Sequence, residues 1–538
     1  MVNIVVNKSE ITGKLKLSDN EINSLLFNLK SEAKPIDNTH LEVEVNPDRL
    51  DMLYPSGIRR AIYGLTEVEL GEPKYSIRNS EITFSVDKVP QREYAVTFIA
   101  RGVNINNEDK LKEIIQFQEK LHATIGRKRK KVAIGIHDLD KLNTSAIAYR
   151  LVSKESTFAP LFSEREMKVE EVLRSTQQGK EYGELALVNG TVPAIIDGEG
   201  DILSIPPVIN SRKTQLEIGT KDLLIDVTGT SFDAVAKTAD IIASDFAEGG
   251  ANVEGVKVLP YNEVFPKMER NNVYLTVEKF SRISGIQIPP QEIVHQIQRM
   301  RMDAEFGDRV KVSVPPFRVD ILEDVDVVEE ILMSIGYNNI PMEPVQKGSL
   351  GKADYKQRVI NTIRELVIGA GFLEVFSYVL TSSRTLHGDY ALISNPISEL
   401  YDAVRNSLIP SILDVMSSNQ SSTFPVKVFE VGDVVIKDSI SDTGYSNVTR
   451  IAMGIMDSEI SYELIQSPVS AILENLGLKP KYRASEEFPF LKGRSSVIEV
   501  RGNKIGVLGE VDPNYLLKLK ITYPVAICEI SIDNLVET

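Results

Sequence analysis

The spacing of apolar residues between positions 310 and 336 predicts a strand followed by a helix. Three valines, from Val310 to Val314, alternate with polar residues, which is the period of a strand with one buried face. Two prolines end that strand. Apolar residues from Val325 to Ile335 then recur at intervals of three and four, so they form one stripe of a helix, and Gly336 suits its C-cap.

Four acidic residues accompany this predicted helix, namely Asp320, Asp326, Glu329 and Glu330. Carboxylate oxygens are ligands that magnesium prefers, so their spacing is compatible with a cation site. Acids in the first turn of a helix also oppose the positive end of the helix dipole without any metal. The spacing alone leaves both interpretations open.

The same periodicities predict elements along the rest of the chain. Helices are expected over residues 19–30, 58–65, 110–124, 238–246 and 359–370. Strands are expected over 41–45, 132–140, 223–230, 372–380 and 426–436, within 194–211, and near 495–500, 504–511 and 526–531.

A chain of 538 residues exceeds what one hydrophobic core usually holds, which predicts an α+β protein of several domains. We expect an N-terminal α/β unit at residues 1–75 and a mixed sheet covered by helices at 76–266. A small helix-turn-helix-like or winged unit is expected at 267–343. A helix followed by a mainly antiparallel sheet is expected at 344–538, with a linker at Gly348-Ser349-Leu350-Gly351.

Composition and charge narrow the classes of function. The contents of 42% apolar and 25% charged residues are ordinary for a soluble protein, and no apolar run is long enough to span a bilayer. The N-terminus lacks the pattern of a signal peptide, so a cytoplasmic protein is expected. A single cysteine, Cys528, excludes an intrachain disulfide and a zinc site built on several cysteines, and the five histidines are scattered.

The net charge of −15 argues against a protein that coats nucleic acid nonspecifically. The run Arg127–Lys131, RKRKK, is nevertheless strongly basic. Such a run is either a solvated loop or a local contact to nucleic acid.

Six motifs follow one another along the chain, namely EVNPDRLDML, GRKRKKVAIGIHDLD, SIPPVINS, LIDVTGT, FRVDILEDVDVVEEILMSIGY, and YDAVRNSLIPSIL with VFEVGDV after it. In that order they resemble the β subunit of phenylalanyl-tRNA synthetase, in the shorter form of archaea and the eukaryotic cytosol. The resemblance covers nearly the whole chain. It implies an (αβ)₂ heterotetramer with a phenylalanyl-tRNA synthetase α subunit, which attaches phenylalanine to its tRNA in an ATP-dependent reaction.

The resemblance implies that residues 344–538 form a class II synthetase-like core without the catalytic arginines. In an active core, arginines beside a glutamate and on a later helix stabilise the charge of adenylate formation. Here the strand with Glu430 has no arginine, and neither has the final segment CEISIDNLVET. This core is then expected to form an interface to the active α subunit. Its helix at 359–370 suits a core within the domain about equally well.

A hydrolytic editing function is implied for residues 76–266. Tyrosine differs from phenylalanine by one hydroxyl, which an apolar synthetic pocket rejects poorly. A second pocket that hydrogen-bonds the phenol prefers tyrosine, because phenylalanine leaves the polar groups of that pocket unpaired. The resemblance assigns Asp226 to the phenol, and Thr228 lies on the same face of the strand. An acid inside an apolar strand is costly without such a role.

Ser204 and Asn210, at the ends of SIPPVIN, are candidates for positioning the ester or the attacking water, and Asn210 equally suits a turn. His137 lies beside two aspartates without a nucleophile motif, so we expect a hydrogen-bonded structural histidine. Water attack on an activated ester needs little beyond positioning and an oxyanion donor, so no covalent intermediate is expected.

In the longer bacterial members of the family, magnesium binds at the spacing of the four carboxylates described first. The resemblance therefore implies a structural magnesium ion that ties the third unit to its neighbours. This chain has no room for the oligonucleotide-binding-like and anticodon-binding domains of those members, so the basic run and the third unit are the candidate tRNA contacts. Two alternatives are a noncatalytic scaffold with a decayed editing site and a free-standing editing protein.

Overall fold

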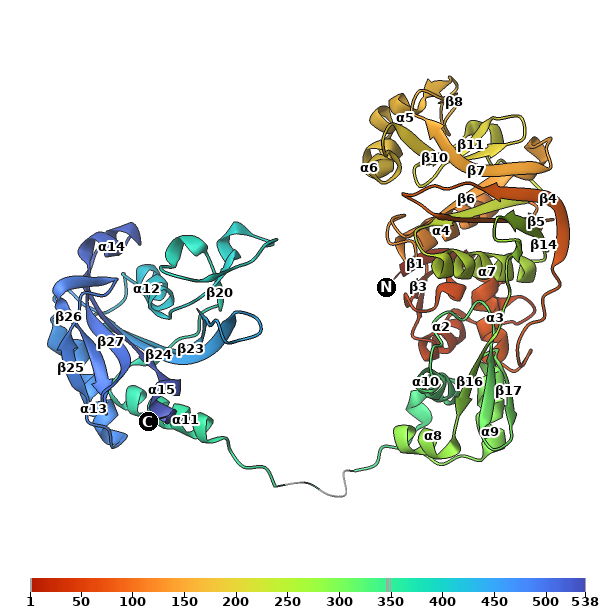
Figure 1. The fold of residues 1–538 in the computed structure, drawn as a ribbon. Coiled ribbons are helices and arrows are strands. Elements are labelled where there is room, and N and C mark those ends of the chain that lie inside the picture. Colours follow the sequence, from red (N-terminus) through yellow and green to blue (C-terminus); the bar gives the residue numbers. More distant parts are fainter. Residues whose placement is uncertain (1, 345–347, 349, 538) are drawn as a thin grey trace. The chain divides into compact units, whose positions relative to one another are not determined.

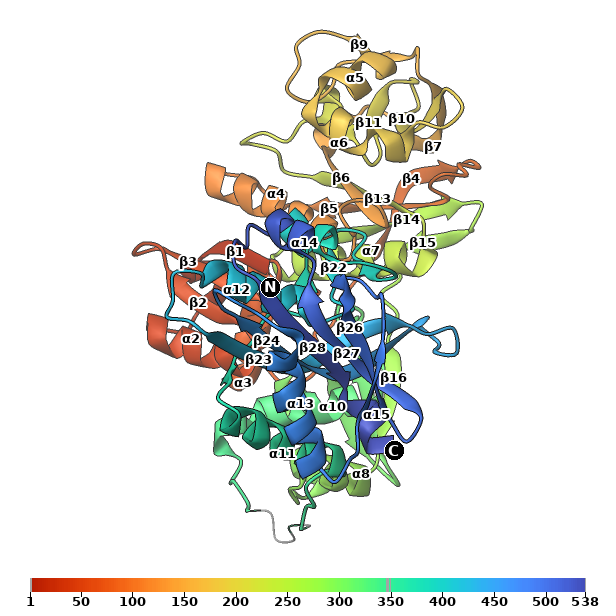
Figure 2. The same cartoon turned by 90° about the vertical axis from the view of Figure 1, so that its left-hand side faces the viewer.

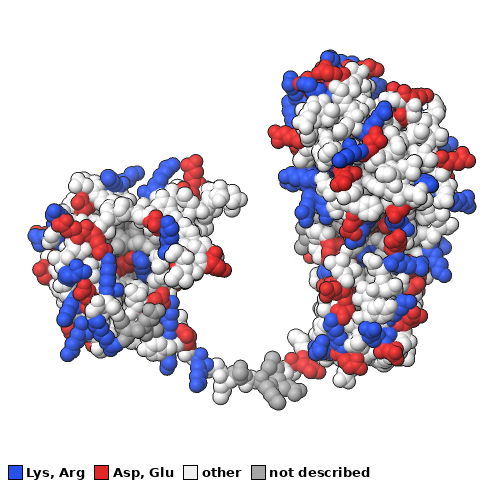
Figure 3. Space-filling model, viewed as in Figure 1, with Lys and Arg blue, Asp and Glu red and all other residues white. Residues whose placement is uncertain are grey.

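The computed structural model describes residues 2–344, 348 and 350–537 of the chain. These residues form two units, residues 1–344 (unit 1) and 345–538 (unit 2) (Figure 1). The predicted linker at 348–351 follows this division, and its Ser349 lies outside the described residues. Figure 3 shows Lys and Arg interspersed with Asp and Glu on the viewed face of each unit.

Unit 1 begins with a three-stranded antiparallel sheet. Its order is β1 (Val2–Asn7), β3 (His40–Val45) and β2 (Glu32–Pro35), accompanied by α1 (Lys8–Thr12), α2 (Asp19–Asn28), η1 (Leu50–Met52) and α3 (Pro55–Leu65). Alternate residues of β3 are buried, and the side chain of Ser18 caps α2 in a capping box with Glu21. The predicted strand and the two predicted helices of this region are therefore confirmed.

A ten-stranded mixed sheet follows. Its order is β12 (Ile209–Asn210), β11 (Ile202–Ile205), β10 (Thr191–Asp197), β7 (Ala146–Ser153), β4 (Arg78–Val86), β14 (Asn252–Leu259), β5 (Tyr94–Arg101), β13 (Leu223–Gly229) and β6 (Val132–Asp138), with β15 (Glu263–Phe265) on β14. β4 runs parallel to β7 and β14, and the other pairs are antiparallel. The mixed sheet expected from the sequence is thus present.

Helices cover this sheet and close the region around β13. α7 (Phe232–Glu248) packs on β5 and β13, α4 (Glu108–Ala123) packs on β6, and α6 (Gln177–Ala186) packs on β10 (Figures 1 and 2). The shorter elements here are η2 (Leu139–Lys141), β8 (Thr157–Phe158), β9 (Met167–Lys168), α5 (Val169–Ser175) and η3 (Arg212–Thr214). All seven residues of β13 are buried, so any polar side chain on that strand must find a partner inside the protein.

The third part of unit 1 contains the stretch with which the sequence analysis began. The antiparallel sheet β16 (Asn271–Leu275), β18 (Val310–Val314) and β17 (Asp303–Phe306) packs with α8 (Val277–Ser284), α9 (Pro290–Arg299), α10 (Asp324–Ile335) and η4 (Tyr337–Asn339). The predicted strand and helix are confirmed, and Gly336 follows α10 at φ +87°.

The main hydrophobic core of unit 1 runs from Ile4 in the first sheet through the ten-stranded sheet to Met333 in α10. A second, smaller core is formed by residues between Phe158 and Ile209. The sequence-based boundaries at 75/76 and 266/267 therefore fall within a shared core. The division of the chain into four domains stays a prediction.

Unit 2 is built on a seven-stranded sheet. Its order is β19 (Leu373–Glu374), β23 (Val426–Lys437), β24 (Tyr445–Met456), β28 (Val525–Ser531), β27 (Asn503–Val511), β26 (Phe490–Val500) and β25 (Lys481–Ala484), and only the β19–β23 pair is parallel. α11 (Tyr355–Gly369), α13 (Tyr462–Asn475) and α15 (Ile532–Glu537) belong to one core, and α12 (Ile409–Ser418) and α14 (Pro513–Lys518) to a second. A helix followed by a mainly antiparallel sheet was expected and is observed.

The strand predicted over 372–380 is wrong, because only β19 and, at its far end, β20 (Leu380–Thr381) pair there. β20 belongs to a small sheet with β22 (Ala403–Val404) and β21 (Ala391–Leu392), near η5 (Ser383–Thr385) and η6 (Glu399–Tyr401). Phe376 and Tyr378 are each 77% exposed, so the apolar alternation does not mark a buried strand face.

The apolar stripe of α11 packs inside unit 2. Ile360, Ile363 and Val367 are buried in the same core as β23 and β24. These three positions therefore belong to a core within the domain, as one of the two interpretations of this helix predicted. Throughout the described residues, moreover, no helix is long and apolar enough to cross a membrane.

Candidate functional site

A cavity of about 420 Å³ lies in unit 1, lined by residues of α4, β6, α6, β11, β12 and β13. This volume is within the range of small-molecule sites. Asp226, Ser204 and Asn210, which come from three different strands, all line it. The fourth predicted residue, Thr228, is not among the lining residues.

Asp226 provides the carboxylate of the cavity. Only 1% of its surface is exposed, and its Oδ2 accepts a hydrogen bond of 2.8 Å from Nε2 of His137. The other ring nitrogen, Nδ1, lies 2.7 Å from the hydroxyl of Thr214. Both contacts are satisfied when Nε2 carries the proton and the Thr214 hydroxyl donates to Nδ1. His137 is therefore hydrogen-bonded on both sides and orients Asp226, as expected for a structural histidine.

A glycine on the neighbouring strand makes room for this carboxylate. Gly135 in β6 stands directly opposite Asp226 in the ladder between β6 and β13. A Cβ atom at Gly135 would lie 1.9 Å from Asp226 Oδ2 and 2.8 Å from His137 Nε2. Any larger residue would thus displace the carboxylate. Sequence reasoning missed Gly135, because its role depends on the strand register.

Ser204 and Asn210 face each other across the β11–β12 pair. The Ser204 hydroxyl is buried and has no hydrogen-bond partner among the described residues. The Asn210 side chain donates to the carbonyl of Ile136 over 3.3 Å, so it is tied to β6 instead of serving a local turn. An orphaned hydroxyl and a fixed amide therefore stand on the cavity wall, which is an arrangement that a polar ligand satisfies.

Thr228 belongs to a different contact. Its hydroxyl accepts a hydrogen bond of 2.8 Å from Nε of Arg92, and its carbonyl accepts a second of 2.7 Å from Nη2. Burial lowers the pKa of Arg92 to about 10, so this guanidinium stays charged at neutral pH. Arg92 also donates to the carbonyl of Arg129, which lines the cavity. Thr228 is therefore connected to the cavity wall indirectly, through Arg92.

The basic run forms a left-handed turn after α4. Arg127, Lys128 and Arg129 have φ values of +48°, +53° and +63°, which are uncommon for residues with side chains. The turn sends Arg129 into the cavity, where Nη1 donates to the carbonyls of Pro207 (3.1 Å) and Val208 (3.0 Å). The rest of the run behaves differently: Arg127, Lys128 and Lys130 are exposed. In this run, Arg129 therefore binds backbone carbonyls at the cavity, whereas Arg127, Lys128 and Lys130 form an exposed basic surface.

Arg129 also pairs with Glu119, through a hydrogen bond of 2.6 Å from Nη2. Although burial opposes the charged form, hydrogen bonds from His122 and Arg129 lower the pKa of Glu119 to about 2. Burial lowers the pKa of His122, whose Nε2 accepts the backbone N–H of Ile134. His122 is therefore neutral at pH 7 and occupied at both nitrogens, so it offers no free general base.

The four carboxylates proposed for magnesium do not converge on a shared point. The buried guanidinium of Arg318 binds Asp320 through Nε (3.0 Å) and Nη2 (2.7 Å), and Glu330 through Nη1 (2.7 Å). Asp326 accepts the backbone N–H groups of residues 322 and 323 as part of a capping box, and Glu329 lies 3.4 Å from Lys30. The residues therefore do not fit a magnesium ion, because Arg318 already neutralises two of them.

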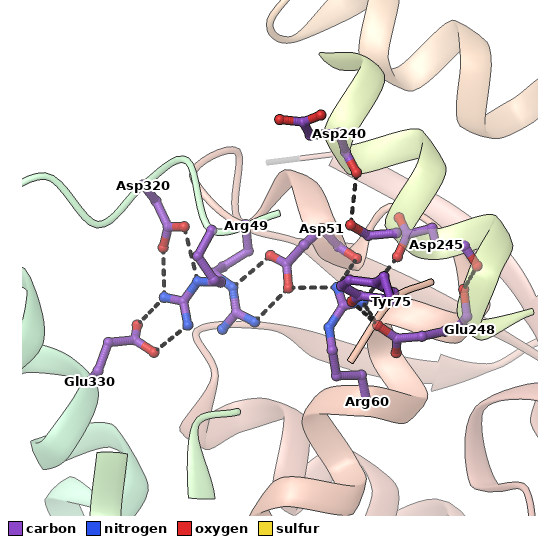
Figure 4. A network of polar contacts seen from close by, with 12 residues as sticks. Arg49, Asp51, Arg60, Tyr75, Asp240, Asp245, Glu248, Asp320 and Glu330 are labelled. Atoms are coloured by element: carbon purple, nitrogen blue, oxygen red, sulfur yellow. Dashed lines mark hydrogen bonds and ion pairs between the residues drawn. The ribbon is translucent and has the colours of Figure 1, made fainter. Parts of the chain in front are cut away.

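Figure 4 shows Asp320 and Glu330 beside a buried network that reaches α7. Arg49 and Arg60 both bind Asp51, and Arg60 Nη1 also donates to Glu248 over 2.7 Å. The bonds of Arg60 connect the first part of unit 1 to α7, whereas Arg318, Asp320 and Glu330 bond to one another within the third part. Elsewhere in the described residues, Asp197, Glu199 and Asp201 lie close together, and Lys213 binds all three.

Comparison with known proteins decides the family. The phenylalanine–tRNA ligase β subunit of Saccharolobus solfataricus is 47% identical over 99% of both chains, and that of Sulfurisphaera tokodaii is 43% identical over 99% of both. This chain belongs to the phenylalanine–tRNA ligase β subunit family. The model of the tRNA synthetase B5 domain matches residues 273–337, and that of the phenylalanyl tRNA synthetase beta chain CLM domain matches residues 340–532.

A solved structure supports the β-subunit assignment for unit 1. An N-terminal fragment of the phenylalanyl-tRNA synthetase β subunit of Pyrococcus horikoshii superimposes with a TM-score of 0.60 at 32% identity. The alignment covers 62% of this chain and the whole of that fragment.

Residues 340–532 of this β subunit contain a buried and a partly buried ion pair that the sequence did not reveal. Arg405 Nη1 donates to Glu430 over 2.7 Å, and Gly432 leaves space for the arginine, since a Cβ there would lie 2.3 Å from Nη2. Arg450 Nη1 donates to Glu529 over 2.6 Å. The strand of Glu430 lacks an arginine as stated, yet an arginine reaches that glutamate from another segment. Each guanidinium is neutralised by its glutamate.

Proposed function

We propose that this chain serves as the β subunit of a phenylalanine–tRNA ligase and that its cavity hydrolyses tyrosyl-tRNA formed in error. The β-subunit role rests on the near full-length relationship to curated β subunits. The editing role is carried by one observation: Asp226 stands on a fully buried strand with its carboxylate facing a cavity. A buried acid of this kind is costly unless it has a partner.

Selection of tyrosine follows from the geometry of Asp226. His137 holds Oδ2, and among the described residues Oδ1 has no hydrogen-bond partner. A tyrosyl phenol donates its hydroxyl proton to Oδ1, which forms a charge-assisted hydrogen bond. A phenylalanyl ring leaves Oδ1 desolvated and unpaired, which costs about 1–3 kcal/mol or more. The cavity therefore favours the amino acid that the synthetic site must reject.

The hydrolysis requires only positioned water. Water adds to the ester carbonyl, the C–O bond to the ribose breaks, and the products are tyrosine and a tRNA with a free hydroxyl. Ser204 and Asn210 are the groups we assign to the ester or the water. Neither His122 nor His137 hydrogen-bonds Ser204, since both have other partners. Ser204 thus lacks the base that activates a nucleophile, which supports the absence of a covalent intermediate.

We assign the tRNA contact to the exposed part of the basic run, Arg127, Lys128 and Lys130. These cations follow the same turn that sends Arg129 into the cavity, so they stand next to the proposed hydrolytic site. Phosphate contacts of this kind position nucleic acid without reading its sequence. The helix-turn-helix-like third part of unit 1 is the second candidate contact.

The synthetic site is assigned to an α subunit in an (αβ)₂ assembly, in the cytoplasm. In this proposal, unit 2 is a class II synthetase-like core that binds no ATP. Support comes from Arg405 and Arg450, whose charges are already neutralised by Glu430 and Glu529. Phosphate groups need cations that are free to meet them. No step of the proposed function runs through magnesium at Asp320, Asp326, Glu329 or Glu330.

The test is to co-express the chain with its α subunit and to assay both charging and the release of tyrosine from tyrosyl-tRNA. Asp226→Ala should lower tyrosine release by about tenfold to a hundredfold, the loss expected for a charged hydrogen bond, with phenylalanine charging unchanged. Gly135→Ala should do the same by displacing the carboxylate.

Gly183→Ala is the matched control, since a Cβ there meets its nearest neighbour at an ordinary 3.5 Å. Unchanged release in Asp226→Ala would overturn the assignment. If the wild-type complex charges tRNA without releasing tyrosine, the scaffold alternative holds. If the chain without an α subunit releases tyrosine as fast as the complex does, the free-standing alternative gains support.

A further inference from the structure

Phe162 stands at the rim of the cavity with 81% of its surface exposed. It occupies the third position of a turn closed by a 3.0 Å hydrogen bond from the N–H of Ser163 to the carbonyl of Pro160. Its φ of +69° is the value that a type II turn requires at this position. Glycine usually takes such a position, because a side chain there is strained.

Neither the positive φ of Phe162 nor the exposure of its ring stabilises the chain in the absence of a ligand. A phenylalanine at positive φ is strained, and an exposed aromatic ring forgoes the burial that normally stabilises it. Residues with a strained backbone cluster at active sites and ligand-binding segments, where a ligand compensates for the strain. A ligand that covers the ring is therefore the simplest account of Phe162.

The turn is held in a defined position relative to the cavity. The N–H of Leu161 donates to the carbonyl of Asn210 over 2.9 Å, and Pro160 bridges to Ser211. Because Asn210 also lines the cavity wall, the ring of Phe162 is coupled directly to the site. The rim beside it is formed by polar residues of α6, including Gln177, Gln178 and Glu181.

We propose that the ring of Phe162 is a platform on which the terminal base of the tRNA stacks while the aminoacyl ester occupies the cavity. This inference rests on the proposed function. The ester joins the amino acid to the terminal ribose, so a tyrosyl group directed at Asp226 leaves the attached nucleoside at the rim. Bases of single-stranded ends stack on aromatic side chains, and glutamine side chains suit the edges of a base.

Phe162→Gly is the decisive variant, because it removes the ring and relieves the strain at once. We expect its thermal stability to equal or exceed that of the wild type, so loss of folding cannot explain an effect on activity. In the complex with the α subunit, the KM for hydrolysis of tyrosyl-tRNA should rise roughly tenfold, with kcat little changed. Phe162→Trp should keep the wild-type KM.

Two comparisons isolate the base. Hydrolysis of tyrosine ethyl ester, which has no nucleoside, should be the same in Phe162→Gly and the wild type. Phe27→Ala, which removes another exposed phenylalanine in α2, should leave the KM for tyrosyl-tRNA unchanged.

The outcomes separate this inference from the proposed function. If the wild type hydrolyses tyrosyl-tRNA, Asp226→Ala does not, and Phe162→Gly keeps the wild-type KM, only the stacking platform is wrong. The platform is equally wrong if Phe162→Gly weakens assembly with the α subunit, since the ring would then bind protein. If the wild type hydrolyses no tyrosyl-tRNA, the proposed function fails and this inference fails with it.

Discussion

Buried acids in this chain differ according to the partner that each one meets. Asp226 meets the imidazole of His137, which holds its Oδ2 over 2.8 Å. Asp320 and Glu330 meet the guanidinium of Arg318, which cancels their charges. Asp240 in α7 accepts the backbone N–H of Met268 over 3.1 Å, and burial raises the pKa of its carboxyl to about 7. The same functional group thus lines a cavity in Asp226, forms ion pairs in Asp320 and Glu330, and has a pKa near neutrality in Asp240.

The raised pKa of Asp240 gives a pH-dependent prediction. The folded chain prefers the protonated carboxyl, so its stabilising effect is complete below the ordinary pKa of 3.8 and is lost as pH rises through about 7. Asp240→Asn cannot titrate. The variant should therefore gain stability relative to the wild type between about pH 4 and pH 7.5, with about 4 kcal/mol as the upper limit set by the two pKa values.

Urea unfolding of both proteins across this pH range measures the difference directly. Comparing the two proteins cancels the titration of all other groups that they share. A stability difference that stays constant from pH 4 to pH 7.5 would contradict the assigned pKa.

At the scale of elements, the start of α10 and the segment before it are stabilised by a capping box and by ion pairs. The capping box at Glu323 and Asp326 begins the helix, which is the interpretation that needs no metal. Arg318 pairs with Asp320 and Glu330 inside the third part of unit 1. The third part is tied to the first part by other arginines, because Arg299 Nη2 donates to the carbonyl of Leu65 over 3.0 Å and Arg301 Nη2 donates to Glu69 over 2.9 Å. A guanidinium with fixed donors meets two carboxylates better than a hydrated ion does in a dry interior.

This arrangement predicts that magnesium has no effect on the stability of unit 1. Chelation with EDTA, or addition of millimolar magnesium, should leave the unfolding temperature unchanged. Arg318→Met should lower stability by about 3–5 kcal/mol, because it leaves the buried carboxylate of Glu330 and the partly buried carboxylate of Asp320 uncompensated. Chemical unfolding measures the loss.

Arg282→Met in α8 provides the matched control, since the same substitution at an exposed arginine should change stability by less than about 0.5 kcal/mol. A rise of several degrees in the unfolding temperature on adding magnesium to the wild type would refute the replacement of the metal by Arg318. This arm uses the wild-type chain, so it remains decisive even if Arg318→Met does not fold.

At the scale of the whole molecule, each unit has its own cores. The cores of unit 1 end at Met333, and the cores of unit 2 begin at Ile360. Independent cores usually fold independently. A fragment of residues 1–344 should therefore fold with the same unfolding temperature as unit 1 in the full chain, as calorimetry of both would show.

A fragment of residues 1–266 tests the finer boundary. It would lose the part of the shared core contributed by Val273 to Met333, together with Arg318 of the buried network. We expect it to be unfolded or strongly destabilised. A stable, cooperatively folding 1–266 fragment would show that the third part is a separate domain after all.

The sequence by itself predicted most elements, and three of its four candidate site residues line the cavity. The periods of β18, α2 and α10 are local properties, so they appear in the pattern of apolar residues. Asp226 could be singled out because an acid in an apolar strand is conspicuous, and Ser204 and Asn210 because they flank a distinctive motif. The prediction of a strand over 372–380 was wrong because it rested on the same kind of local pattern. Alternation of apolar residues shows their spacing but does not show whether one face is buried.

Only the tertiary structure decided which groups meet. Gly135 faces Asp226 across 91 positions of sequence because of strand register, and Arg129 reaches Pro207 through a turn with positive φ. Arg405 and Arg450 neutralise glutamates from distant segments, and Arg318 pairs with two of the four carboxylates expected to bind magnesium. Local sequence sets the shape of an element, whereas the partner of a charge depends on packing between elements far apart in the chain. The chemistry of a carboxylate depends on that partner.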